Sequence, residues 1–303
     1  MRQRSAWTVS LLLAASGQAH AALRVVATTP EYGSLATTIG GARVSVTTLA
    51  KPTEDPHFVD AKPSHIVTLN RADILIEGGA DLEVGWLPPL LEGARNPRIQ
   101  PGTPGHVRAS EGVPLLDVPQ SLDRSQGDLH AAGNPHFMMD PANAAIVARH
   151  VAAALCGSDA DGCASYKENL AGFERTLDEK TKSWSAKLGP YRGTKIVTYH
   201  NTWKYFAARF GLETGVFLEP KPGIPPSPPH LANVIDTMQK DRIRVILVEP
   251  FQSRKTAEMV AEHTGARIVE VCQFPGGLGG GDADYVSLMD TVVERIARAL
   301  AGP

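Results

Sequence analysis

Short apolar runs alternate with amphipathic stretches along most of the chain. The runs at 23–28 and 195–199 are rich in β-branched residues, which is typical of buried strands. The stretch 141–155 carries apolar residues at helical spacing and follows Asp140, a favourable N-cap residue. Because strands and helices alternate, the pattern predicts an α/β fold. The expected strands are 23–28, 44–49, 72–77, 195–199, 215–219, 245–249 and 267–271. The expected helices are 32–39, 64–71, 82–92, 141–155, 164–188, 202–210, 229–240, 255–264 and 285–300.

The stretch 164–188 differs from the rest of the chain. It contains no proline, has only Gly172 as a weak point, and is rich in Lys, Glu, Leu and Ala. One long helix of about 37 Å is the simplest interpretation, at 1.5 Å per residue. The alternation of strands and helices resumes after it. We therefore expect two α/β lobes with central sheets, at 22–160 and 190–303, joined by a linking helix at 161–189.

The N-terminal residues are typical of a secretory signal peptide. Arg2 and Arg4 precede the apolar stretch 6–16, and Ala19-His20-Ala21 provides the small-x-small pattern of a cleavage site. The apolar stretch is shorter than the roughly 20 residues that span a bilayer. We expect a signal peptide at 1–21 and an exported, monomeric protein in the periplasm. Because no cysteine stands near the cleavage site, no lipid anchor is expected.

Composition and net charge argue against two classes of partner, nucleic acids and membrane surfaces. The chain is 43% hydrophobic and 20% charged, with a formal net charge of −2, as in an ordinary globular protein. A nucleic-acid binder usually carries a basic patch or stripe, and no long basic block occurs here. Neither nucleic acid nor a membrane surface is the expected partner.

The three cysteines divide into a pair and a single residue. Cys156 and Cys163 flank a loop of Gly, Ser, Asp and Ala, and in an oxidising compartment they are candidates for a local disulfide. Cys272 is then unpaired. An unpaired thiol in an exported protein requires an explanation, and a bound metal is one.

Three histidines occupy positions where a ligand could bind. His57 follows the second expected strand, His136 precedes a helix, and His200 ends the strand at 195–199. Loops at the carboxyl ends of strands are where α/β proteins bind ligands. Any one such histidine is more often a solvated or hydrogen-bonded loop residue, and the spacing of the three is not a local metal signature.

The wider pattern adds specificity, because several landmarks occur together. They are Asp55-Pro56-His57, Lys62-Pro63-Ser64, the run 72–79, Asn134-Pro135-His136, the long helix, His200, Pro226-Ser227-Pro228 and Val248-Glu249-Pro250. With these landmarks the chain resembles the periplasmic metal-binding receptors of zinc and manganese ABC importers, the cluster that includes ZnuA and TroA. The resemblance implies a carrier and not an enzyme, with Zn²⁺ as the transported ligand. It also implies an ABC permease and its ATPase as partners.

The resemblance further implies a ligand set. His57 and His136 match two family ligands, and His200 matches a third, which is His in zinc-type receptors and Glu in many manganese-type ones. The fourth family ligand is usually an Asp after the last strand, where this chain has Cys272. Three imidazoles and a thiolate suit tetrahedral zinc, whereas manganese prefers oxygen ligands.

Four alternatives stay open. Cys272 could instead be a buried free thiol. Asp282 or Asp284 could reach the metal from the glycine-rich loop 276–281. The receptor could carry manganese or iron. A zinc-dependent hydrolase is the rival from another class, with three histidines, a water and Glu249 as base, but no His-Glu-x-x-His motif occurs.

Two further residues near these positions have expected roles. His130 lies in a sparse polar loop with Asp123 and Asp128, and this loop could capture metal. Glu249, at the end of an expected strand near the cleft, is expected to hydrogen-bond to a ligand residue.

Overall fold

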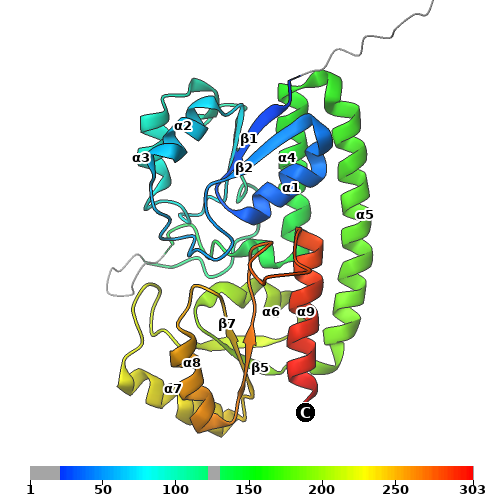
Figure 1. Cartoon of the computed structure of the whole chain (residues 1–303). Coiled ribbons are helices and arrows are strands. Elements are labelled where there is room, and N and C mark those ends of the chain that lie inside the picture. Colours follow the sequence, from blue (N-terminus) through cyan, green and yellow to red (C-terminus); the bar gives the residue numbers. More distant parts are fainter. Residues whose placement is uncertain (1–20, 122–129, 303) are drawn as a thin grey trace, which may run out of the picture.

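The computed structural model describes residues 21–121 and 130–302 (Figure 1). The expected signal peptide lies outside the described residues apart from Ala21, as do Asp123 and Asp128. Within the described residues, no helix combines the length and the apolar character needed to cross a membrane.

The first half of the chain forms a four-stranded sheet in the order β2-β1-β3-β4, with every pairing parallel. Its strands are β1 (Leu23–Ala27), β2 (Val44–Thr48), β3 (Ile74–Glu77) and β4 (His106–Arg108). The helices of this half are α1 (Pro30–Gly40), α2 (Pro63–Arg71), α3 (Leu87–Ala94) and α4 (Pro141–Ser158). Short 3₁₀ turns occur at η1 (Gly41–Arg43), η2 (Pro97–Ile99), η4 (Phe137–Met139) and η5 (Ala160–Gly162).

The second half repeats this arrangement, with a parallel sheet in the order β6-β5-β7-β8. Its strands are β5 (Lys195–Thr198), β6 (Glu213–Phe217), β7 (Val245–Val248) and β8 (Arg267–Glu270). Its helices are α6 (Lys204–Phe210), α7 (Pro228–Asp241), α8 (Arg254–Thr264) and α9 (Tyr285–Ala301), with 3₁₀ turns η6 (Gly189–Tyr191) and η7 (Asn201–Trp203).

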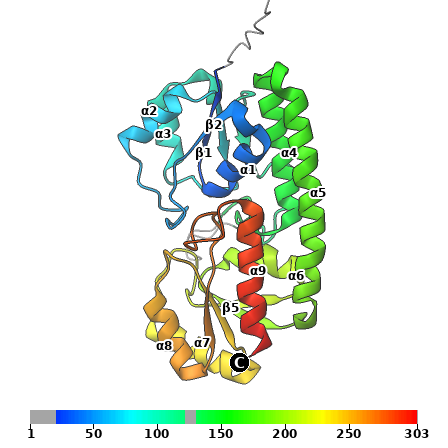
Figure 2. The same ribbon diagram turned by 45° about the vertical axis from the view of Figure 1, so that its right-hand side comes forward.

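The long helix predicted from the sequence is present as α5 (Cys163–Leu188). It packs on α1 and α4 of the first half and on α9 of the second, and it runs beside both sheets (Figures 1 and 2). Its buried residues, which include Phe173, Leu177 and Trp184, recur at helical spacing and face these helices. The predicted α/β architecture with one long linking helix is therefore confirmed.

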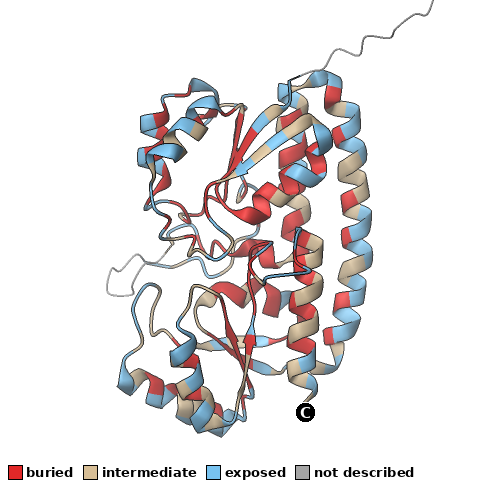
Figure 3. Cartoon of the chain, viewed as in Figure 1, coloured by how far each residue is buried: buried red, intermediate tan, exposed pale blue. Residues whose placement is uncertain are grey.

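Three hydrophobic clusters hold the layers together. The largest contains one face of each sheet together with α1, α4, α5, α6 and α9, and it is continuous from one half to the other. A second lies between the first sheet and α2 and α3, and a third between the second sheet and α7 and α8. The buried residues follow the sheets and the inward faces of the helices (Figure 3). Each sheet is thus covered on both faces, as parallel sheets require.

Two elements differ from the sequence prediction. The helix expected at 82–92 begins only at Leu87, because the preceding residues form turns with Ala80 and Asp81 at positive φ. The carboxylate of Glu83 accepts the backbone N–H groups of Gly78 and Gly79, which fixes these turns. The sequence prediction also missed β4, a strand of three residues.

The disulfide predicted between Cys156 and Cys163 is present, and the prediction is confirmed. It joins the last turn of α4 to the first residue of α5. The covalent bond therefore fixes the tight connection from which the long helix starts.

Candidate metal centre

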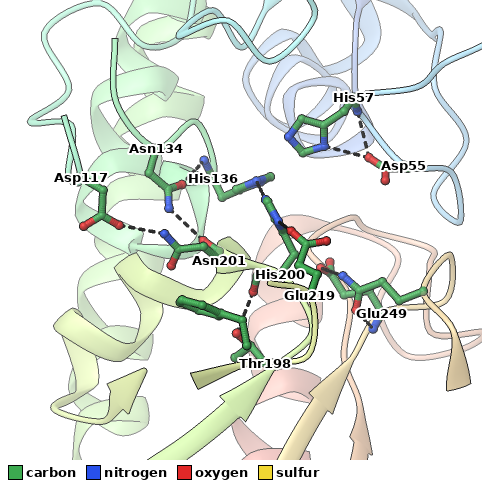
Figure 4. Close-up of polar contacts among 12 residues, drawn as sticks. Asp55, His57, Asp117, Asn134, His136, Thr198, His200, Asn201, Glu219 and Glu249 are labelled. Carbon is green, nitrogen blue, oxygen red and sulfur yellow. Dashed lines mark hydrogen bonds and ion pairs between the residues drawn. The ribbon is translucent and has the colours of Figure 1, made fainter. Parts of the chain in front are cut away.

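Three histidines from distant parts of the chain meet between the two sheets. His57 lies in the loop after β2, His136 directly before η4, and His200 two residues after β5 (Figure 4). One ring nitrogen of each lies within 4.8 Å of a nitrogen of the other two. The three ring centroids are 5.1 to 5.4 Å apart. The rings line a cavity of about 170 Å³.

The same local turn presents His57 and His136. The Asp55 side chain accepts the backbone N–H of His57 at 3.0 Å, and the Asn134 side chain accepts that of His136 at 3.0 Å. A proline separates the two residues in each case. This is an Asx turn with a proline of fixed φ at its centre, which limits the directions in which the imidazole can point.

Each of the three rings uses Nδ1 to contact a hydrogen-bond acceptor. His57 Nδ1 lies 2.8 Å from Asp55 Oδ1, His136 Nδ1 lies 3.0 Å from Gln273 Oε1, and His200 Nδ1 contacts Glu219 Oε1. Because these oxygens can only accept, Nδ1 carries the proton in each ring. The lone pair is then on Nε2, the usual arrangement of metal-binding histidines.

The free Nε2 atoms lack suitable partners inside the protein. His136 Nε2 and His200 Nε2 lie 3.2 Å apart, and His57 Nε2 is buried with no hydrogen-bond partner within 21–121 and 130–302. Two lone pairs at that separation repel unless a proton or a cation lies between them. At a zinc–nitrogen distance of about 2.0–2.1 Å, two ligands of a tetrahedral site lie roughly 3.3 Å apart. The facing pair therefore has the spacing of a tetrahedral zinc site.

The surroundings of the site favour the neutral form of the His136 ring and place carboxylates beside the three imidazoles. Burial, followed by the neighbouring His200 and His57, lowers the pKa of His136 well below its ordinary value. A neutral imidazole is the form that binds metal. The carboxylates of Asp55 and Glu219 supply two negative charges beside the rings. Burial acts to raise the pKa of Asp55, but the hydrogen bond and charge of His57 outweigh it and the pKa is lowered.

Cys272, the expected fourth ligand, is not part of the group of three histidines. Its thiol is buried and lies 3.4 Å from the carbonyl oxygen of Pro52, to which it donates, and it accepts the N–H of Phe274 at 3.3 Å. Burial raises the pKa of this thiol well above its ordinary value. The sulfur is therefore engaged as a protonated thiol at the contact between the two halves.

The two alternative carboxylates are also used elsewhere. Asp282 accepts the backbone N–H groups of Leu278 and Gly280 and so closes the glycine-rich loop on itself. Asp284 caps α9 through a reciprocal pair of hydrogen bonds with Ser287. Neither aspartate belongs to the histidine group.

Two residues of the site were missed in the sequence. Glu219 and Gln273 both contact imidazoles, Glu219 from two residues after β6 and Gln273 from three residues after β8. Their position at the carboxyl ends of the strands of the second sheet was the available signal. Glu249, which the sequence placed near the cleft, is buried with Oε1 lacking a partner, and burial raises its pKa to about 7.

The chain matches the ZnuA family, described as "Zinc-uptake complex component A periplasmic", over residues 25–299. It is 23% identical to the manganese ABC transporter substrate-binding lipoprotein PsaA of Streptococcus anginosus, over 97% of this chain and 95% of that protein. It is 22% identical to the iron ABC transporter substrate-binding lipoprotein MtsA of Streptococcus pyogenes serotype M1, over 92% of this chain and 89% of that protein.

Solved structures agree with this similarity. The crystal structure of ZnuA superposes with a TM-score of 0.77 at 25% identity and covers 92% of this chain and 99% of that chain. The Mn-bound periplasmic metal-binding protein of Candidatus Liberibacter asiaticus superposes with a TM-score of 0.75 at 21% identity, with the same coverage.

The resemblance found in the sequence is thereby confirmed, and the hydrolase alternative loses its support because the family consists of receptors and not of enzymes. The chain belongs to the ZnuA family, the solute-binding receptors of metal ABC importers.

Proposed function

We propose that this protein binds Zn²⁺ through His57, His136 and His200 in the periplasm and delivers it to an ABC permease driven by its ATPase. The observation that carries the proposal is the facing pair of Nε2 atoms, 3.2 Å apart, each belonging to a ring whose Nδ1 is engaged by an oxygen. A cation between them replaces the repulsion of two lone pairs with two coordinate bonds.

Zinc is favoured over manganese by the chemistry of these side chains. Every nitrogen offered is an imidazole nitrogen, which suits zinc, whereas manganese prefers carboxylate, carbonyl and water oxygens. Iron also accepts imidazole, but Fe²⁺ precedes Zn²⁺ in the usual order of increasing affinity for such sites. The carboxylates nearby contact Nδ1 atoms and so stabilise the imidazoles indirectly. The manganese and iron named for two relatives make those metals the competitors that any measurement must include.

A competitive titration of the mature protein tests the proposal. Zinc should bind with a stoichiometry of one and displace manganese. His57→Ala, His136→Ala and His200→Ala should each lower zinc affinity by more than the roughly 10–100-fold that loss of an outer-shell partner costs. His263→Ala is the matched control, because this histidine is exposed on α8. Equal zinc affinity in the parent and in all three site variants would refute the proposal.

A further inference from the structure

A fourth histidine lies beside the three already described. The His130 ring centroid is 5.2 Å from that of His57, the same separation as between His57 and His136. His130 lines one cavity together with His136 and His200, and a second cavity together with His57. The His130 ring thus lies against that of His57 and shares a cavity with His136 and His200, although His130 does not belong to the group whose ligand atoms lie within 4.8 Å of one another.

The His130 ring is held by the backbone of Asp81 and, within the described part of the chain, not by a side-chain oxygen. It forms a hydrogen bond with the backbone of Asp81, whose carboxylate also accepts the N–H of Ala131 at 2.8 Å. Its Nε2 is buried and has no hydrogen-bond partner among the residues that the structure describes. A buried polar atom without a partner costs about 1–3 kcal/mol, so it calls for a ligand. Among the described residues, His57 Nε2 and His130 Nε2 are thus both buried atoms that lack a hydrogen-bond partner.

The candidates for a fourth ligand that the sequence offered are engaged elsewhere. The thiol of Cys272 contacts Pro52, and the carboxylates of Asp282 and Asp284 bind backbone N–H groups. Three imidazoles alone leave one corner of a tetrahedral ion without a protein ligand. Among the described residues near the group, His130 Nε2 and Glu249 Oε1 are buried without a partner, and of these two it is His130 that supplies an imidazole and whose ring lies against that of His57.

We propose that His130 is the fourth ligand, so that the ion is held by four imidazoles, and this proposal rests on the proposed function. The proposal requires the His130 side chain, whose ring centroid lies 5.2 Å from that of His57, to turn toward the ion on binding. Four neutral imidazoles with no carboxylate in contact with the ion favour zinc, and also cobalt or copper, over manganese. His130 therefore sets the selectivity of the site as well as its affinity.

The test compares single variants of the mature protein by competitive zinc titration and by X-ray absorption at the zinc edge. His130→Ala should lose at least about 10-fold in zinc affinity, and the number of imidazoles counted at the ion should fall from four to three. Its preference for zinc over manganese should fall as well. His263→Ala and Cys272→Ala should match the parent, and circular dichroism of the metal-free proteins establishes that each variant is folded.

The outcomes separate this proposal from the proposed function. If His130→Ala keeps the parent affinity and imidazole count while His200→Ala loses binding, His130 is not a ligand, yet the three-histidine receptor stands. If Cys272→Ala loses affinity and the absorption spectrum of the parent contains a sulfur ligand, the thiol is the fourth ligand and the present proposal is overturned. If His200→Ala and His130→Ala both bind as the parent does, the proposed function itself fails.

Discussion

At the scale of single residues, the hydrogen-bond acceptor of each imidazole Nδ1 contributes to metal binding together with the imidazole itself. His200 and His57 are backed by carboxylates, whereas His136 is backed by the amide oxygen of Gln273. A carboxylate raises the basicity of the ring more than an amide does and also contributes charge against the ion. The buried ring of His136 thus has a neutral amide as its partner, and the more accessible rings of His57 and His200 have carboxylates.

Glu219 offers a direct measurement of this contribution. Glu219→Ala leaves His200 Nδ1 without its acceptor, and zinc affinity should fall about 10–100-fold. Glu219→Gln keeps an oxygen acceptor of the kind that serves His136, so its loss should be smaller than that of the alanine variant. Competitive titration of both variants at one pH gives the comparison. Equal affinities in the parent and the alanine variant would show that His200 is oriented by other contacts.

A buried carboxyl group at the start of α1 should make stability depend on pH. Glu31 accepts the hydroxyl of Thr29 at 2.8 Å, and its second oxygen has no partner. Burial is the main cause that raises its pKa from 4.5 to about 8. Because the folded state holds the proton more tightly than the unfolded state, the stabilisation is present below pH 4.5 and is lost as pH rises through about 8.

Glu31→Gln should remove this dependence, since the amide does not titrate. Between pH 5 and pH 9 the free energy of unfolding, measured in urea, should decrease in both proteins. The decrease should be roughly 2–4 kcal/mol smaller in the variant than in the parent. Glu168→Gln, on the exposed side of α5, should follow the parent. Parallel pH profiles for parent and Glu31→Gln would mean that Glu31 ionises freely in the folded protein.

At the scale of elements, the sequence predicted the regular helices and the long strands well and the short or strained segments poorly. The helix α5 was predictable because its 26 residues have strong helix propensity and no proline. The strand β4 was not, because His106 and Arg108 flank a single apolar residue and no alternation can be seen. The late start of α3 follows from the tertiary contact of the Glu83 carboxylate with Gly78 and Gly79.

The site shows the same division. The grouping of the three histidines was predictable only from the family resemblance, because their spacing is not a local metal signature. Their acceptors Glu219 and Gln273 were not, since contact between residues far apart in the chain depends on the fold. The orientation of Cys272 depends on Gly277 as well: a Cβ there would lie 2.3 Å from the sulfur, so only glycine leaves room for the thiol against Pro52. No periodicity in the sequence reports such a contact.

The disulfide between α4 and α5 gives a prediction at this scale. It closes a loop with a sequence separation of 7, for which the chain-entropy relation gives about 2.5 kcal/mol. Cys156→Ser combined with Cys163→Ser should lower the free energy of unfolding by roughly 2–3 kcal/mol. Zinc affinity should be unchanged because the pair is not part of the metal centre. Reduction of the parent with a thiol should reproduce the loss, and an unchanged urea midpoint would contradict the prediction.

At the scale of the whole molecule, the metal would join segments that the chain separates widely. His57 belongs to a loop of the first sheet and His200 to the end of a strand in the second, so one ion bonded to both links the two halves. The unfolded chain cannot hold these residues at coordination distance. Binding is then confined to the folded state, and it must raise the apparent stability of the protein.

This linkage can be measured as a thermal shift. Free zinc at 100 times its dissociation constant should stabilise the fold by about 2.7 kcal/mol. For a chain of this size that corresponds to a rise in Tm of roughly 4–5 °C. A chelator should reverse the rise, and His200→Ala should show none at the same zinc concentration, because the ion would no longer bond to the second half. An equal rise in the Tm of His200→Ala would mean that the stabilising zinc binds at a different site. The ion could then not be assigned to the contact between the two sheets.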